Sequence, residues 1–108
     1  MMIEVIYYRG YNRVTVKGHA KSAEAGHDLV CASASMLAYT LAANVAKMAE
    51  NGQVREPILK TKLGDAKISC NPKHNLKASV TLVFDSLCVG FEMLAIRYPE
   101  YITYEIRP

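Results

Sequence analysis

The chain has 108 residues, of which 51% are hydrophobic and 21% are charged. This is the balance of a globular domain and excludes a disordered or fibrous chain. Its net charge of +3 comes from basic residues scattered along the sequence without a dense Lys/Arg block, so we expect no direct nucleic-acid binding.

The cysteines and the N-terminal segment indicate in which cellular compartment the protein resides. The three cysteines form no C-x-x-C pair, which argues against a disulfide framework and against a cysteine zinc site. The first residues lack the basic region and the long apolar stretch of a signal peptide. We see no run of about 18 apolar residues that would cross a bilayer. We therefore expect one domain over residues 1–108, in the cytoplasm, without a membrane partner.

The first predicted elements are two strands. Residues 3–9 are rich in β-branched and aromatic types, which fit a pleated surface. Residues 13–18 alternate polar and apolar side chains, with Val14 and Val16 on the apolar side. A turn at residues 10–12 joins the two runs, which predicts an antiparallel hairpin.

A loop and a long helix follow the hairpin. Residues 20–27 are small and polar and predict a loop. Asp28 is a favourable N-cap, because its carboxylate accepts from the free amides of a first turn. Apolar residues then recur at helical spacing over residues 29–50, and Gly52 suits a left-handed cap.

The second half of the chain repeats this order and ends in a strand. Residues 58–70 read as a hairpin around Gly64 and Asp65, residues 80–95 as a second amphipathic helix, and residues 101–106 as a strand. The order β-β-α-β-β-α-β predicts an α+β two-layer sandwich, with two helices packed on one face of a mostly antiparallel five-stranded sheet. We expect a second copy of the chain to shield the open sheet face.

The residues that can carry chemistry lie between the first hairpin and the first helix. His19 ends the second predicted strand, and Cys31 lies in the first helical turn if Asp28 is the N-cap. The free amides and the dipole of a first turn favour a thiolate and can donate to the oxyanion of a tetrahedral intermediate. We interpret Cys31 as a nucleophile and His19 as its base. Asp28 would cap the helix, orient His19, or do both.

The segment between His19 and Cys31 is expected to be a flexible substrate loop. Ala20, Gly26 and His27 belong to this loop, which would open for an extended peptide and close afterwards. A metal site from His19, His27 and Cys31 matches no zinc spacing and lacks a fourth ligand, so we expect no metal and no cofactor.

Other readings of these residues stay open. Free cysteines are usually buried and inert, and this reading is preferred for Cys70 and Cys88. Four tyrosines would line an aromatic pocket or would pack in the sheet and helix. These tyrosines are Tyr7, Tyr8, Tyr11 and Tyr39.

The segment from Gly18 to Ser35 resembles the signature of the ribosomal-processing cysteine protease Prp (YsxB-like) family. The matching residues are Gly18-His19-Ala20, then Gly26, Asp28-Leu29-Val30-Cys31-Ala32, and Ser35. Length, element order and the segment at residues 98–102 are also similar. Ser33 departs from the pattern, because a small apolar residue is expected there, and it leaves open whether Ser33 or Ser35 points at the site.

The resemblance implies the helix-on-sheet fold, a catalytic His19 and Cys31, and supporting roles for Asp28 and Ser35. It implies an endopeptidase that removes the N-terminal extension of the large-subunit ribosomal protein L-twenty-seven during bacterial ribosome assembly. It also implies a homodimer.

Two functions of other classes compete with the protease. A thiol redox or peroxide-sensing module would use the same thiolate but needs a resolving cysteine. A non-catalytic ribosome-associated binding protein would use the mild positive charge, and the absence of a basic cluster in the sequence counts against it.

Overall fold

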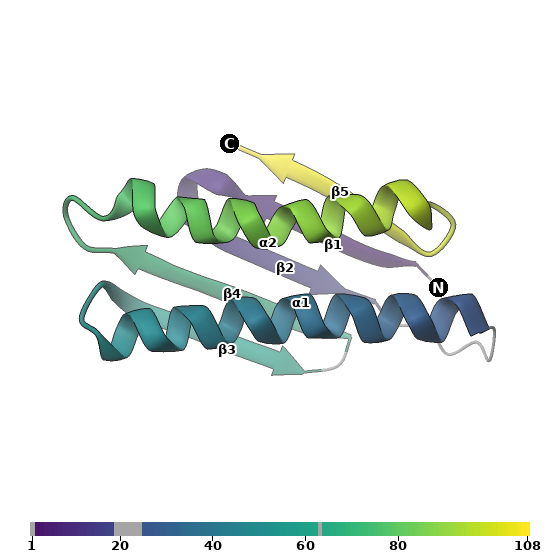
Figure 1. Ribbon diagram of the computed structural model, residues 1–108, viewed down its shortest axis with the longest axis horizontal. Helices are drawn as coiled ribbons and strands as arrows, with labels where there is room; N and C mark the ends of the chain where they lie inside the picture. Colours follow the sequence, from purple (N-terminus) through teal and green to yellow (C-terminus); the bar gives the residue numbers. More distant parts are fainter. Residues whose placement is uncertain (1, 19–24, 63) are drawn as a thin grey trace.

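The structure is a computed structural model, and it describes residues 2–18, 25–62 and 64–108. Two helices lie side by side on one face of a five-stranded sheet (Figure 1). The predicted class and order of elements are therefore confirmed. In chain order the elements are β1 (Ile3–Tyr8), the 3-10 helix η1 (Arg9–Tyr11), β2 (Arg13–Lys17), α1 (Ala25–Glu50), β3 (Val54–Lys62), β4 (Asp65–Pro72), α2 (Lys77–Arg97) and β5 (Ile102–Arg107).

The sheet is mixed, and its strand order is β3-β4-β2-β1-β5. Both predicted hairpins, β1–β2 and β3–β4, are antiparallel pairs, and β2 also pairs antiparallel with β4. Only β5 runs parallel to its partner β1. The sheet is therefore mostly antiparallel, as predicted, with one parallel edge.

The core lies between the sheet and the two helices. On β2 the predicted inward residues Val14 and Val16 are buried, and on β1 their neighbours Ile3, Val5 and Tyr7 are buried too. Each fully buried large apolar side chain contributes about 1.5–3 kcal/mol. The helices supply the other half of this core with Val30, Ala34, Ala38, Leu41 and Val45 from α1, and Val80, Phe84, Cys88 and Phe91 from α2.

Two polar contacts fix the first hairpin against α2. The Tyr7 hydroxyl donates to Asp85 Oδ1 at 2.8 Å, and the Arg9 guanidinium donates to both oxygens of the same carboxylate at 3.0 Å. The Arg9 guanidinium lowers the pKa of Asp85. Asn12 adopts a left-handed conformation at φ 47° and donates from Nδ2 to Thr81 at 3.0 Å.

The helix α1 begins earlier than the sequence predicts. It starts at Ala25, so Gly26 and His27 lie in its first turn and not in a loop, and Asp28 is the acidic residue of that turn and not the N-cap. The apolar stripe first becomes informative at Val30, so the sequence pattern does not reveal that the four residues 25–28 are helical. An acidic side chain is favourable both at the N-cap and within the first turn. Ala20, the other residue of the predicted loop, lies outside the described residues.

Most of the exposed large apolar side chains lie on the two helices, and Ile58 and Ile106 are exposed on strands. Residues 28–50 and 77–97 reach mean hydropathies of 1.5 and 1.7, which is enough by length and composition for a membrane span. The expectation that no segment has this composition is therefore wrong. Each helix buries one stripe on the sheet, and the apolar residues that face away include Leu29, Met36, Leu82, Val89, Met93 and Ile96.

Candidate active site

Cys31 lies in a small pocket between α1 and the ends of four strands. Its side chain is partly exposed, whereas Val30 before it is fully buried. The pocket has a cavity volume of about 30 Å³. The residues around it come from β1, β2, α1 and the β3–β4 hairpin: Ile3, Val16, Gly18, Cys31, Ala34, Ser35, Ala38, Tyr39, Thr61, Lys62, Gly64 and Ala66.

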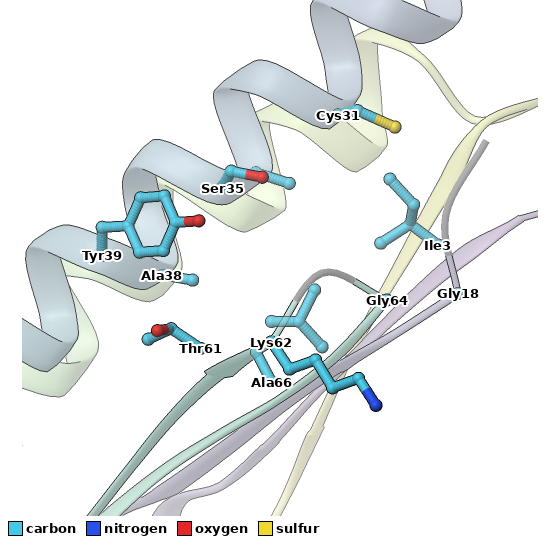
Figure 2. Close-up of a pocket in the computed structure, with 12 residues that line it drawn as sticks. Ile3, Gly18, Cys31, Ser35, Ala38, Tyr39, Thr61, Lys62, Gly64 and Ala66 are labelled. Atoms are coloured by element: carbon cyan, nitrogen blue, oxygen red, sulfur yellow. The ribbon is translucent and has the colours of Figure 1, made fainter. Parts of the chain in front are cut away.

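Three polar side chains of α1 line this pocket from successive turns. Cys31, Ser35 and Tyr39 are spaced four residues apart, which places them on one face of a helix. Figure 2 shows their sulfur and hydroxyl oxygens directed to the same side, over the strand ends. The side chain of Ser33 instead lies in the groove between α1 and α2. The structure thus brings Ser35, and not Ser33, to the side of Cys31.

The backbone opposite Cys31 is held tightly at Gly18. The Gly18 amide donates to the Gly64 carbonyl at 3.0 Å, which joins the end of β2 to the β3–β4 turn. Its φ is +90°, and a Cβ atom there would lie 2.4 Å from the Met2 carbonyl oxygen. Only glycine is compatible with this conformation and this contact. His19 lies outside the described residues, but the residue that precedes it lines the same pocket as Cys31.

Cys31 lies farther from the helix terminus than the sequence predicts. Because α1 begins at Ala25, Cys31 belongs to the second turn. The dipole acts mainly within the first turn, and the free amides belong to the first four residues. The peptide amides of its own turn are therefore not the donors that we expected for an oxyanion. Asp28 is exposed in the first turn, and it does not line the pocket.

The other two cysteines are structural, as predicted. Cys70 and Cys88 are buried in the core. Burial raises the pKa of the Cys70 thiol to about 11 and that of Cys88 to about 12. Buried thiols of this kind are inert. Neither suits the resolving role that a redox module requires, because thiol exchange needs access to the sulfur.

Of the two readings of the four tyrosines, the shared aromatic pocket is not what the structure shows. Tyr7 is buried against Phe84, and the rings of Tyr8 and Tyr11 pair with arginines. Tyr39 alone of the four lines the Cys31 pocket. The cavity accommodates one or two waters, so an aromatic substrate side chain requires its walls to move apart.

Sequence reasoning missed the part of the pocket that comes from the second hairpin. Thr61, Lys62 and Gly64 line the Cys31 pocket, although they lie about 30 positions later in the chain. Nothing in their sequence marks them as site residues. Only the pairing of β4 with β2 brings this hairpin to the end of β2.

Comparisons with known proteins place this arrangement in a family. Residues 2–103 match the family model described as cysteine protease Prp. A search of curated protein sequences gave no match.

Three crystal structures are similar over nearly the whole chain. SMU.848 from Streptococcus mutans is 29% identical, with a TM-score of 0.71, and the alignment covers 97% of this chain and 93% of that one. The essential ribosomal processing protease Prp from S. aureus in complex with a substrate peptide is 19% identical, with a TM-score of 0.68 and 98% of both chains covered. The same S. aureus protease with a covalently linked product peptide is 22% identical, with a TM-score of 0.67 and 98% of both chains covered.

Proposed function

The chain belongs to the Prp cysteine protease family, and on this premise we propose that it cleaves peptides with Cys31 as nucleophile and His19 as base. The observation that carries the proposal is the position of Cys31. It is the partly exposed cysteine of the chain, and it lines a pocket together with the residue that precedes His19. A nucleophile and a base within reach of each other are the minimum that acyl transfer requires.

The catalytic sequence uses one proton carrier. His19 takes the proton from Cys31 Sγ as the sulfur attacks the scissile carbonyl carbon. The tetrahedral intermediate then expels the amine, which receives the proton from His19, and a thioester remains on Cys31. A water, deprotonated by His19, attacks the thioester, and collapse returns the proton to sulfur and releases the carboxylic acid.

Ser35 is the supporting residue that the geometry favours. Its hydroxyl lies one helical turn from Cys31 on the face that lines the pocket (Figure 2). A hydroxyl there can donate to the oxyanion of the tetrahedral intermediate, which the amides of the second turn cannot do because they are bonded within the helix. Asp28, exposed near the start of α1, is proposed to orient His19.

The proposed substrate is the N-terminal extension of the large-subunit ribosomal protein L-twenty-seven, cut during ribosome assembly in the cytoplasm. The S. aureus relative is described as a ribosomal processing protease, and it has been solved with a substrate peptide and with a covalently linked product peptide. A covalently linked product is what a nucleophilic cysteine generates.

A homodimer through the helical layer is also proposed. The outer apolar residues of α1 and α2 flank a groove of about 570 Å³, to which Met36 and Met93 both contribute. Large exposed apolar patches of this kind mark interaction sites. Two copies stacked by their helices would cover both patches and leave the sheets outward, which replaces our expectation that the partner shields the sheet.

The protease assignment is tested with a peptide that spans the extension and its aromatic residues. We expect wild-type protein to cut it once and Cys31→Ala and His19→Ala to lose cleavage at least 1000-fold, on the order of a lost catalytic group. Cys70→Ala is the matched control, because its buried thiol is not used, and it should cut normally. Circular dichroism reports whether each variant folds. Full cleavage by folded Cys31→Ala protein would refute the assignment.

The dimer is tested by multi-angle light scattering without detergent. Wild-type protein should have twice the mass of one chain, and Met36→Glu with Met93→Glu should give one chain. Ile58→Glu, on the exposed sheet face, is the control and should leave the mass unchanged. A monomeric wild type, or a dimer lost only in Ile58→Glu, contradicts the helical interface.

A further inference from the structure

The sheet face turned away from the helices collects basic side chains that are far apart in the sequence. Inward residues of β2 and β4 such as Val14, Val16 and Ile68 are buried, so their neighbours point outward. The pairing extends this pattern to the second half of β3, and Figure 2 shows the Lys62 side chain extending away from α1. These outward cations, which we call the basic face, are Arg13, Lys17, Lys60, Lys62 and Lys67.

Three carboxylates lie next to these five cations and leave the group net positive: Asp65, Glu4 opposite Lys17, and Glu56 in the same hollow as Arg13. Asp65 accepts from Lys60 Nζ at 2.7 Å. Lys17 and Lys62, which flank it in the strand pairing, add to the positive field that lowers the pKa of Asp65. Lys60 also lies directly opposite Lys67. Like charges opposite each other destabilise a sheet, and a bound polyanion relieves this repulsion.

Aromatic rings lie at the other end of the same face. Tyr8 is paired between Arg13 and Arg107 in the strand register, and the Arg107 guanidinium lies 5.6 Å from its ring centre. Tyr11 is 66% exposed, and the Arg13 guanidinium lies 5.9 Å from its ring centre. Exposed rings next to arginines are surfaces on which nucleotide bases stack.

We propose that this sheet face binds single-stranded RNA, with the basic face on phosphates and Tyr8 and Tyr11 against bases. Glu4 and Glu105 on β1 and β5 confine the positive surface to β2, β4 and β3. An acidic protein would be attracted by the lysines alone and would not use the tyrosines. Our expectation of no nucleic-acid contact assumed scattered cations, and the strand register gathers them. The inference does not depend on proteolysis.

The test is fluorescence anisotropy of a labelled 16-nucleotide oligouridylate with the full chain. If all five cations contact phosphates, log Kd should change with log[salt] by about 3.5, from about 0.7 per contact on a single strand. Lys60→Gln with Lys67→Gln should weaken binding roughly 25-fold in 0.1 M salt and reduce the slope by about 1.4. Lys47→Gln with Lys73→Gln removes the same charge from other surfaces and should leave binding within about twofold.

Each outcome decides the proposal. A loss of RNA affinity confined to the Lys60/Lys67 variant, together with weaker RNA binding by Tyr11→Ala, supports the proposal. No binding in 0.05 M salt, equal losses in both double variants, or competition by polyglutamate as strong as that by RNA would overturn it. The Lys60/Lys67 variant should cut peptide at the wild-type rate, since neither side chain lines the Cys31 pocket. A failed cleavage assay in the wild type would therefore leave the RNA result interpretable.

Discussion

Replacing Gly18 by alanine should destabilise the protein and impair the site more than replacing Gly52 by alanine. At φ +90° the new Cβ would lie 2.4 Å from the Met2 carbonyl oxygen. The left-handed conformation costs about 1–2 kcal/mol, and the overlap adds about 1–3 kcal/mol. Met2 cannot simply swing away, because the next amide, that of Ile3, donates to the Tyr101 carbonyl at 2.9 Å.

Gly52→Ala is the matched control for this prediction. Gly52 also has a positive φ, +72°, but its added Cβ would meet only the end of the Lys73 side chain at 3.6 Å. Gly52→Ala should therefore lower the free energy of unfolding only by the cost of the left-handed conformation, about 1–2 kcal/mol. At about 4–8 °C per kcal/mol, Gly18→Ala should melt roughly 4–24 °C below Gly52→Ala.

The assay is thermal unfolding by circular dichroism, followed by peptide cleavage well below both melting temperatures. Folded Gly18→Ala should cut more slowly than folded Gly52→Ala, because Gly18 fixes the backbone that leads to His19. Equal melting temperatures for the two variants would show that the close contact at Met2 does not destabilise Gly18→Ala.

Three further predictions test other parts of the account. Ser35→Ala should lower kcat for peptide cleavage about 10²-fold, as expected for one oxyanion donor, and Ser33→Ala should not; the reverse order would exclude Ser35 as the supporting hydroxyl. Iodoacetamide at pH 8 should label Cys31 alone in folded protein and all three thiols in urea, and native labelling of either buried thiol would contradict the packing. Asp85→Asn should lower the free energy of unfolding by about 1 kcal/mol above pH 5. This difference from the wild type should close as the pH falls below about 4, because the ion pair lowers the folded-state pKa of this carboxyl below its unfolded value of about 3.9. A gap that stays constant down to pH 2 in urea unfolding would rule out that linkage.

The sequence was sufficient for the fold because its periodic patterns are long. Val14 and Val16, and the stripes of the two helices, mark the inward faces directly, and all lie in the core or against it. The sequence pattern was less reliable at the start of α1. Gly26 and His27 there are not part of the apolar stripe, and Asp28 suits both the N-cap and the first turn. Local chemistry there does not distinguish a cap from a first turn.

The site was only partly predictable for a different reason. Cys31 and Ser35 share one helix face by spacing alone, so their proximity follows from the sequence. Thr61 and Lys62 join them through strand pairing, which depends on the whole sheet. The same pairing gathers the basic face, which no linear run of lysines announces.

Cys31 can be identified as the nucleophile by labelling with a peptidyl chloromethyl ketone that carries an aromatic residue before the reactive group. We expect Cys31 Sγ to displace chloride and form a thioether, and the tryptic fragment of residues 22–47 to gain the peptide mass as cleavage is lost. Labelling should be much slower in His19→Ala. An adduct on another residue, or cleavage that persists after Cys31 is fully labelled, would contradict the assignment of Cys31 as the nucleophile.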